Sequence, residues 1–236
     1  MRRVALPLYY FYNSLTNWTV GKDMMVDARR EAMIDSQLRP TGVNDPSVLA
    51  AFRAVDQVRF VPAAASAVAY SDAAIPLAAG RAMLEPMVLG LLLTHAKIAA
   101  GGRVLIVGAG TGYTAAVAAA LGARVTALES DVGLAATARA NLGSGAVVVE
   151  GPLPAGWPDG APYDLVLLDG AAADLPRALL DQIVDGGRLA GVIVGDDGVG
   201  RATVGRVAAG HFAGTGFAET GAPMLPGFAR ARTFVF

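Results

Sequence analysis

The chain has no cysteine, and this absence excludes several classes of protein at once. Its 236 residues offer no thiol for a disulfide, for nucleophilic catalysis or for a zinc ligand set. The only histidines, His95 and His211, lie far apart in the sequence, and no carboxylate-rich motif accompanies either of them. We therefore expect neither a thiol-dependent enzyme nor a metal site.

Clustered positive charge and long apolar runs are also lacking. Lys22 and Lys97 are the only lysines, the arginines are scattered, and the formal net charge is -1. Proteins that bind nucleic acids usually gather Lys and Arg on one face, so no nucleic-acid partner is expected. No segment reaches the roughly 18 uninterrupted apolar residues of a membrane span. We expect a cytoplasmic protein without a membrane partner.

The first 23 residues differ in composition from the rest. Arg2 and Arg3 precede a short aromatic run that Pro7 interrupts, and no small-residue cleavage site follows, so a signal peptide is disfavoured. We interpret residues 1–23 as an appendage, whose order the sequence leaves open. Residues 24–236 are long enough for one substantial core. They predict a single domain with an N-terminal helical cap over about residues 24–98.

The strongest positive signal is an apolar run, residues 104–107, that leads into the alternate glycines Gly108, Gly110 and Gly112. This pattern predicts a buried strand, a tight turn and a helix start, where bare backbone can approach a ligand. The dinucleotide fingerprint requires a further glycine where this chain has Tyr113. A nicotinamide-dependent oxidoreductase is therefore disfavoured.

The order of apolar segments predicts the fold class. We expect an α/β fold: a doubly wound, mostly parallel, seven-stranded, Rossmann-like sheet with helices on both faces, preceded by N-terminal helices. The helix that begins at Pro86 is expected to lie against the first strand. The predicted helices are 26–38, 47–55, 86–97, 113–121, 131–141 and 174–184, and the predicted strands are 103–107, 124–128, 146–150, 163–168 and 188–194, with two more after residue 202.

Ligands of such sheets bind outside the carboxyl ends of the strands. A carboxylate at the second strand end, Glu129, can accept both hydroxyls of a ribose; the alternative is a solvated strand end. Glu150 is either an adenine-side contact or a solvent-facing strand end, and Asp169 is either a crevice residue or a turn or helix cap. The predicted cofactor-binding residues are Gly108, Ala109, Gly110, Thr111, Gly112, Glu129, Glu150, Gly151 and Asp169.

Several further motifs occur in a fixed order, and together they resemble one family. They are Met33 to Asp45, Arg59 to Pro62, Ala69 to Asp72, the glycine turn, Asp181 to Ile183 and Gly186 to Leu189. Over about residues 27–195 the chain resembles the protein L-isoaspartyl O-methyltransferases, which are class I S-adenosylmethionine-dependent methyltransferases. The resemblance implies S-adenosylmethionine as cofactor, and methyl transfer to the carboxylate of an isoaspartyl residue in a protein or peptide. A carboxylate, with a pKa near 4, needs no general base at neutral pH.

The chain departs from this family in the acceptor loop. Where family members carry G-Q-T-I-S-Q-P, this chain has residues 80–86, and Ala82 and Leu84 replace the two hydroxyl residues. The candidate acceptor-loop residues are Arg81, Leu84 and Glu85. One interpretation is drift in an active methyltransferase, with Arg81 taking over acceptor binding. The other is a changed substrate or lost catalysis, which would leave a cofactor-binding regulatory member of the same family.

Overall fold

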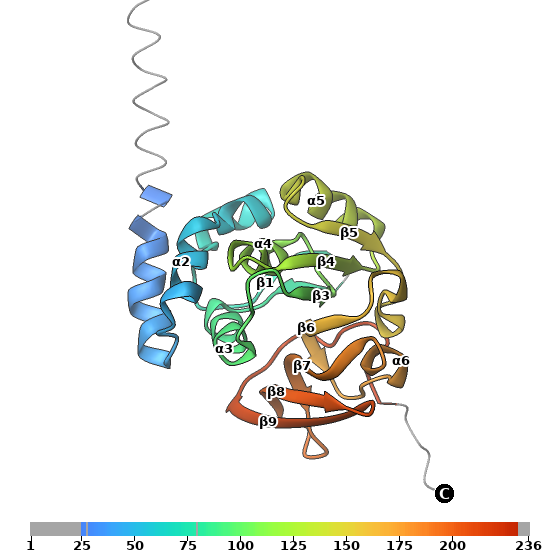
Figure 1. The fold of residues 1–236 in the computed structure, drawn as a ribbon. Coiled ribbons are helices and arrows are strands. Elements are labelled where there is room, and N and C mark those ends of the chain that lie inside the picture. The colour runs from blue at the N-terminus through green and yellow to red at the C-terminus, as the bar shows by residue number, and fades with distance from the viewer. Residues whose placement is uncertain (1–24, 27, 79, 231–236) are drawn as a thin grey trace, which may run out of the picture.

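The structure is a computed structural model that describes residues 25–26, 28–78 and 80–230. A seven-stranded sheet in the order β5-β4-β3-β6-β7-β8-β9 forms its centre (Figure 1). The first five strands in this order are parallel, and β8 and β9 are antiparallel to their neighbours. The strands are β3 (Arg103–Val107), β4 (Arg124–Glu129), β5 (Val147–Glu150), β6 (Tyr163–Ala172), β7 (Ile183–Val194), β8 (Gly200–Ala208) and β9 (His211–Glu219).

Most of the predicted elements are confirmed. The predicted seven strands are present, and the helices between the first of them are α4 (Tyr113–Ala120) and α5 (Val132–Leu142). The cap of α2 (Pro46–Ala54) forms as the Asp-Pro pair predicts, because the Asp45 carboxylate accepts from the backbone N–H groups of Ser47 and Val48. Residues 28–33 are helical and continue into a π-helix, η1 (Ile34–Leu38), and a short 3₁₀ turn, η2 (Arg39–Thr41). The interpretation of residues 1–23 concerns a segment outside the described residues.

Two predicted features are wrong. The helix expected over 174–184 shrinks to α6 (Arg177–Leu180), and β7 begins at Ile183, earlier than predicted. The Gln182 side chain donates to the carbonyls of Ala155 and Ala178 and accepts from Trp157 N, and its backbone carbonyl accepts from Tyr163 N. These bonds turn the chain out of the helix and into the sheet.

The position of the helix from Pro86 is the second correction. This helix, α3 (Pro86–Ala96), packs mainly against β7 and β8 rather than against the first strand. It is apolar on nearly every side, because the N-terminal cap covers the surface that it turns away from the sheet. At its C-terminal end, Arg188 of β7 donates to the carbonyls of Ala96 and Lys97.

The two faces of the sheet have separate cores. On one face α2, α3 and α4 pack with the N-terminal cap over side chains such as Val104, Ile106 and Leu167. On the other face, the short α6 and irregular segments cover Leu105 and Leu168. Helices therefore lie on both faces, as expected, but very unequally. Among the described residues, no helix combines the length and the apolarity needed to cross a bilayer.

A small hairpin that the sequence did not predict precedes α3. Its strands, β1 (Ile75–Pro76) and β2 (Ala82–Met83), are antiparallel and pair over two residues each. The loop between them is closed by Leu77 N donating to Arg81 O and by Arg81 N donating to Ala78 O. The hairpin carries Arg81 and places it beside the glycine turn, while Leu84 and Glu85 lie between β2 and α3.

Candidate functional site

The glycine turn follows β3 as predicted and has the backbone that glycine permits. Gly108, Gly110 and Gly112 have φ values of 80°, 56° and 98°, in the left-handed region that residues with a Cβ rarely adopt. The N–H groups of Gly108 and Ala109 both donate to Leu128 O, at 2.9 and 3.0 Å. The turn is thereby fixed to the end of β4, next to Glu129.

Thr111 and Tyr113 anchor the turn to the N-terminal cap. The Thr111 hydroxyl donates to Phe60 O at 2.5 Å, and Asn141 Nδ2 donates to Thr111 O at 3.0 Å. Tyr113 is buried at the start of α4, with its ring centroid 6.4 Å from that of Phe52 and 5.6 Å from that of Phe60. The residue that replaces the dinucleotide glycine is therefore a core residue that joins the cap to the sheet.

Glu129 lies at the carboxyl end of β4 and is fully buried. Its Oε2 accepts from Gly110 N at 2.7 Å, and its Oε1 accepts from Ser130 N at 2.7 Å and from Asp131 N at 3.1 Å. Three backbone donors thus hold one carboxylate at the turn. The alternative of a solvated strand end is wrong for this residue.

Arg81 supplies the counter-charge to Glu129. Arg81 Nη1 lies 2.9 Å from each carboxylate oxygen of Glu129, and Arg81 Nη2 donates to Gly108 O at 2.5 Å. The two side chains are 4% and 0% exposed. This is a buried ion pair between the acceptor loop and the predicted ribose-binding residue, which the sequence predicts as two separate sites.

Asp169 lies near Arg81 and Glu129 because β6 bulges there, and we call these three residues and the glycine turn the crevice. Leu167 pairs with Ala190 and Ala171 with Val192, so residues 168–170 of β6 stand opposite Gly191 alone. Asp169 lies inside the strand and is 6% exposed, which excludes the turn or helix-cap alternative. Among the described residues its Oδ1 has no hydrogen-bond partner. Burial raises the pKa of Asp169 to about 7, and neighbouring Thr114 and Arg81 partly oppose that rise.

The remaining predicted site residues lie farther out or deeper. Glu150 is at the surface end of β5, paired with Arg139, while Gly151 N donates to Glu129 O at 3.1 Å. Leu84 is 2% exposed and belongs to the core on the helical face. Glu85 precedes α3, and burial, together with nearby Asp72, raises its pKa. Contacts of these residues with a cofactor or an acceptor stay predictions.

The C-terminal segment also enters the crevice, a position that the sequence did not predict. Leu225 N donates to Ala171 O, and Ala171 N donates to Pro223 O, both at 2.8 Å, so this segment runs along the end of β6. Leu225 is 1% exposed. The sequence predicts two strands after residue 202, and it carries no signal that places this segment beside β6.

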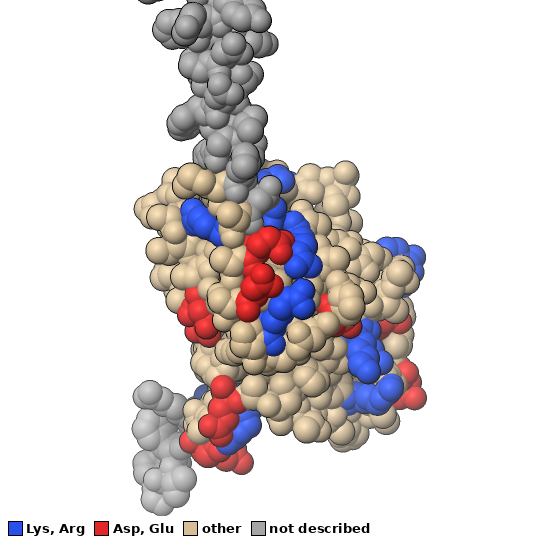
Figure 2. Space-filling model, turned by 90° about the vertical axis from the view of Figure 1, so that its left-hand side faces the viewer, with Lys and Arg blue, Asp and Glu red and all other residues tan. Residues whose placement is uncertain are grey.

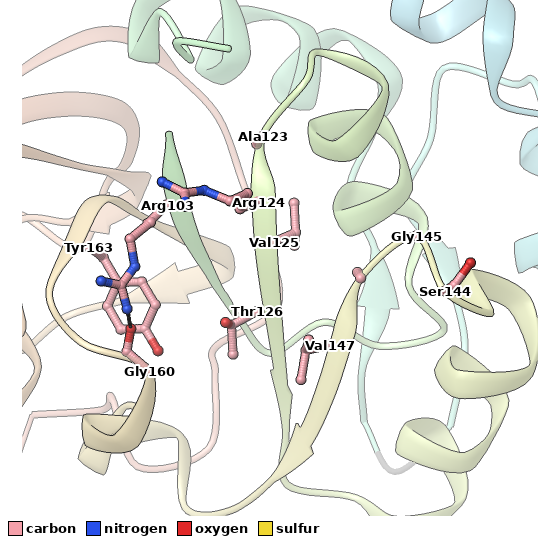
Figure 3. Close-up of a pocket in the computed structure, with 11 residues that line it drawn as sticks. Arg103, Ala123, Arg124, Val125, Thr126, Ser144, Gly145, Val147, Gly160 and Tyr163 are labelled. Carbon is pink, nitrogen blue, oxygen red and sulfur yellow. Dashed lines mark hydrogen bonds between the residues drawn. The ribbon is translucent and has the colours of Figure 1, made fainter. Parts of the chain in front are cut away.

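A hollow of about 550 Å³ lies at the amino ends of β3, β4 and β5, whereas the crevice lies at the carboxyl ends of the strands (Figure 3). Arg103 in its wall donates to the carbonyl of Gly160, and Arg124 donates to that of Gly101. Both arginines are therefore already bonded to the chain, and ligands of open α/β sheets bind at the other strand ends. We assign no site to this hollow.

One face of the molecule carries mixed charge, and the described ranges contain no cluster of side chains that could hold a metal ion. Within 25–26, 28–78 and 80–230 no group of three or more His, Asp or Glu side chains could hold a metal ion. On the side shown in Figure 2, basic and acidic side chains lie next to each other. The pairs Arg53–Glu31 and Arg39–Asp35 are examples of this arrangement from the N-terminal cap.

The parallel strand order, the glycine turn and the carboxylate at the end of β4 define the class I methyltransferase fold. A family model described as protein-L-isoaspartate(D-aspartate) O-methyltransferase matches residues 28–201. The chain belongs to this family.

Sequence relatives agree with the family model. A protein-L-isoaspartate O-methyltransferase of Methylorubrum populi is 41% identical over 168 residues, which are 70% of this chain and 79% of the relative. Protein-L-isoaspartate O-methyltransferase 1 of Rhodopseudomonas palustris is 40% identical over 166 residues, which are 69% of this chain and 68% of the relative.

Solved structures agree on the fold. One protein-L-isoaspartate O-methyltransferase superposes with a TM-score of 0.72 at 22% identity, covering 84% of this chain and 66% of that one, so this chain spans slightly less than two thirds of its length. A second, from Plasmodium falciparum and in complex with S-adenosyl-L-homocysteine, has a TM-score of 0.71 at 17% identity and covers 84% of this chain and 97% of that one.

The chemical groups of the crevice suit an adenosyl cofactor. The turn offers bare backbone, Glu129 offers a carboxylate, and Asp169 offers an oxygen that no described residue engages. The position of Arg81 is the exception, since its guanidinium bonds to both oxygens of Glu129. Any ligand that needs those oxygens must displace it.

Proposed function

We propose that this chain transfers a methyl group from S-adenosylmethionine to a carboxylate of a protein or peptide, with isoaspartyl residues as the first candidate acceptor. The observation that carries the proposal is Glu129: a fully buried carboxylate that three backbone N–H groups hold at the glycine turn. Membership of the family and the printed names of the relatives support the choice of cofactor and acceptor.

When it is bound, S-adenosylmethionine supplies a methyl group activated by a positively charged sulfur. Glu129 would accept from the ribose hydroxyls, since a carboxylate has two oxygens in a fork. Asp169 would accept an N–H or O–H of the ligand through its unpartnered oxygen. The glycine turn would lie against the ligand with no side chain of its own in the way.

The acceptor needs positioning more than proton transfer. An isoaspartyl carboxylate is ionised at neutral pH, so the chain has to orient its oxygen and exclude water rather than remove a proton. This agrees with a crevice whose titratable side chains are Glu129, Arg81 and Asp169 and include no histidine. The buried Leu84 contributes no hydrogen bond to an acceptor, and its side chain packs in the core.

The test is the transfer of tritium from methyl-labelled S-adenosylmethionine to an isoaspartyl peptide, with the same peptide carrying normal aspartate as control. We expect base-labile label in the isoaspartyl peptide alone, at a low rate because the acceptor-loop hydroxyls are missing. Calorimetry should show binding of S-adenosylhomocysteine and none of NAD. Label in both peptides, or in neither although the cofactor binds, would contradict the proposed acceptor.

A further inference from the structure

The crevice that should receive the cofactor is filled by the chain's own side chains. A methyl group placed on Gly108 would lie 2.5 Å from Arg81 Nη2 and 2.7 Å from Leu225 Cδ2. One placed on Gly110 would lie 2.9 Å from Leu77 Cδ1, and one on Gly170 would lie 2.7 Å from Leu225 Cδ2. The glycine faces that leave room for a ligand are therefore covered from within.

Arg81 also uses the hydrogen-bonding capacity that a ribose would need. A carboxylate offers about four lone-pair positions. Glu129 already receives three backbone N–H groups, the Ser130 hydroxyl at 3.3 Å and two contacts from Arg81 Nη1, so a ribose hydroxyl can bond to it only by replacing a donor that is present. Arg81 Nη1 is the long-range side-chain donor that contacts both carboxylate oxygens, and it is therefore the donor that ribose hydroxyls would replace. Seating of Arg81 and binding of an adenosyl ligand through Glu129 exclude each other.

The element that carries Arg81 is held by few bonds. The β1–β2 hairpin pairs over two residues in each strand, and Arg81 stands at the junction of its loop and β2. By contrast, the strand that carries Glu129 is paired on both sides, by β3 and β5. When Arg81 separates from Glu129, we expect the hairpin to move and β4 to stay, because fewer hydrogen bonds hold the hairpin.

We propose that Arg81 is an intramolecular plug that holds the crevice closed, and that the adenosyl cofactor binds only after Arg81 has left Glu129. This inference rests on the proposed function, and it adds a regulatory residue to the site. The measured Kd equals the Kd of the open crevice divided by the fraction of molecules that are open. A seated Arg81 therefore weakens apparent cofactor binding without any contact to the bound cofactor.

The test compares the wild-type chain with Arg81→Gln, which places the family's glutamine in the acceptor loop and removes the charge. Calorimetric titration with S-adenosylhomocysteine should give a Kd at least tenfold lower for the variant. The matched control is Arg53→Gln. It also removes an arginine that forks to a carboxylate, at 2.8 and 2.9 Å from Glu31, but outside the crevice. Its Kd should equal that of the wild type.

The outcomes separate the plug from the proposed function. Equal or weaker binding by Arg81→Gln, with clear binding by the wild type, overturns the plug and leaves the proposed function standing. Absence of binding in both proteins overturns both.

A second measurement needs no variant that has to fold. In ¹⁵N-arginine-labelled wild type, we expect slow rotation of the Arg81 guanidinium, whose side chain is 4% exposed. Saturating S-adenosylhomocysteine should make this rotation fast. If the rotation stays slow in the saturated protein, Arg81 does not leave and the plug is overturned.

Discussion

The buried pair of Arg81 and Glu129 should respond unequally to the loss of either partner. In Glu129→Gln the guanidinium of Arg81 stays buried, at 4% exposure, and loses its counter-charge, while the neutral Gly108 carbonyl still accepts from it. The new amide also presents a donor to backbone groups that are themselves donors. Breaking a buried ion pair in this way costs about 3–5 kcal/mol of unfolding free energy.

In Arg81→Gln the group that loses its partner is the Glu129 carboxylate, which keeps other hydrogen bonds. Glu129 keeps its three backbone N–H donors, at 2.7, 2.7 and 3.1 Å, so its charge stays solvated by the turn. We expect a loss of roughly 1–3 kcal/mol, the range for one unmatched hydrogen-bonding group. The double variant should lose less than the two single losses together, with a coupling of about 2 kcal/mol, within the range for contacting residues.

Urea unfolding at pH 7, followed by far-UV circular dichroism, measures all four proteins of this cycle. The order of stability should be wild type, Arg81→Gln, then Glu129→Gln. A variant Arg81→Gln that is as unstable as Glu129→Gln would refute the claim that the three N–H groups support the carboxylate. A coupling of zero would refute the ion pair itself.

Four further predictions concern other parts of the site. Burial raises the pKa of Asp169 to about 7, so the folded chain keeps a proton that the unfolded chain loses above pH 4; stability should fall by up to roughly 4 kcal/mol as pH rises from 4 to 7. Urea titrations at several pH values should show this slope in the wild type and not in Asp169→Asn. Gly108→Ala introduces a Cβ at φ 80° and 2.5 Å from a guanidinium nitrogen, and should cost about 1–3 kcal/mol in thermal unfolding; an unchanged melting temperature would contradict the described turn. Ala82→Thr with Leu84→Ser should raise tritium transfer to the isoaspartyl peptide, while thermal unfolding reports the roughly 2–5 kcal/mol that loss of the buried leucine removes; unchanged transfer would make the loop difference neutral. A chain that begins at Met25 should bind S-adenosylhomocysteine with the Kd of the full chain, and a weaker Kd would show that the preceding residues support the crevice.

The local signals in the sequence were sufficient for the central part of the fold. Residues 104–107 belong to a strand because they are apolar and a glycine follows them. Glu129 ends the next strand, at the carboxyl ends of the strands, where ligands of open α/β sheets bind. The prediction of a helix over 174–184 was wrong. The apolar spacing there is that of a helix, but the hydrogen bonds of Gln182 to distant residues end the helix and start β7. Such bonds leave no periodic trace in the sequence.

The contacts inside the crevice were beyond the reach of sequence reasoning. Arg81 and Glu129 are 48 residues apart, and Leu225 comes from the end of the chain. Arg81 is recognisable in the sequence as a departure from the family's acceptor loop, but no rule of sequence spacing places it next to Glu129 or Leu225. The one available hint was charge: an arginine in the acceptor loop of a chain that has a carboxylate at the second strand end.

The bulge in β6 has a consequence for how this site can vary in length. It adds two residues, so Leu167 and Ala171 still face the same side of the sheet and pack in the same core. Removing both extra residues would keep every later side chain of β6 on its own face, whereas removing one would exchange the two faces. Insertions or deletions of an even number of residues therefore change the part of β6 that carries Asp169 and keep the core packed. Those of an odd number turn the core side chains of β6 to the wrong face. The parity of the strand divides the sequence alterations that can retune this crevice from those that would unfold it.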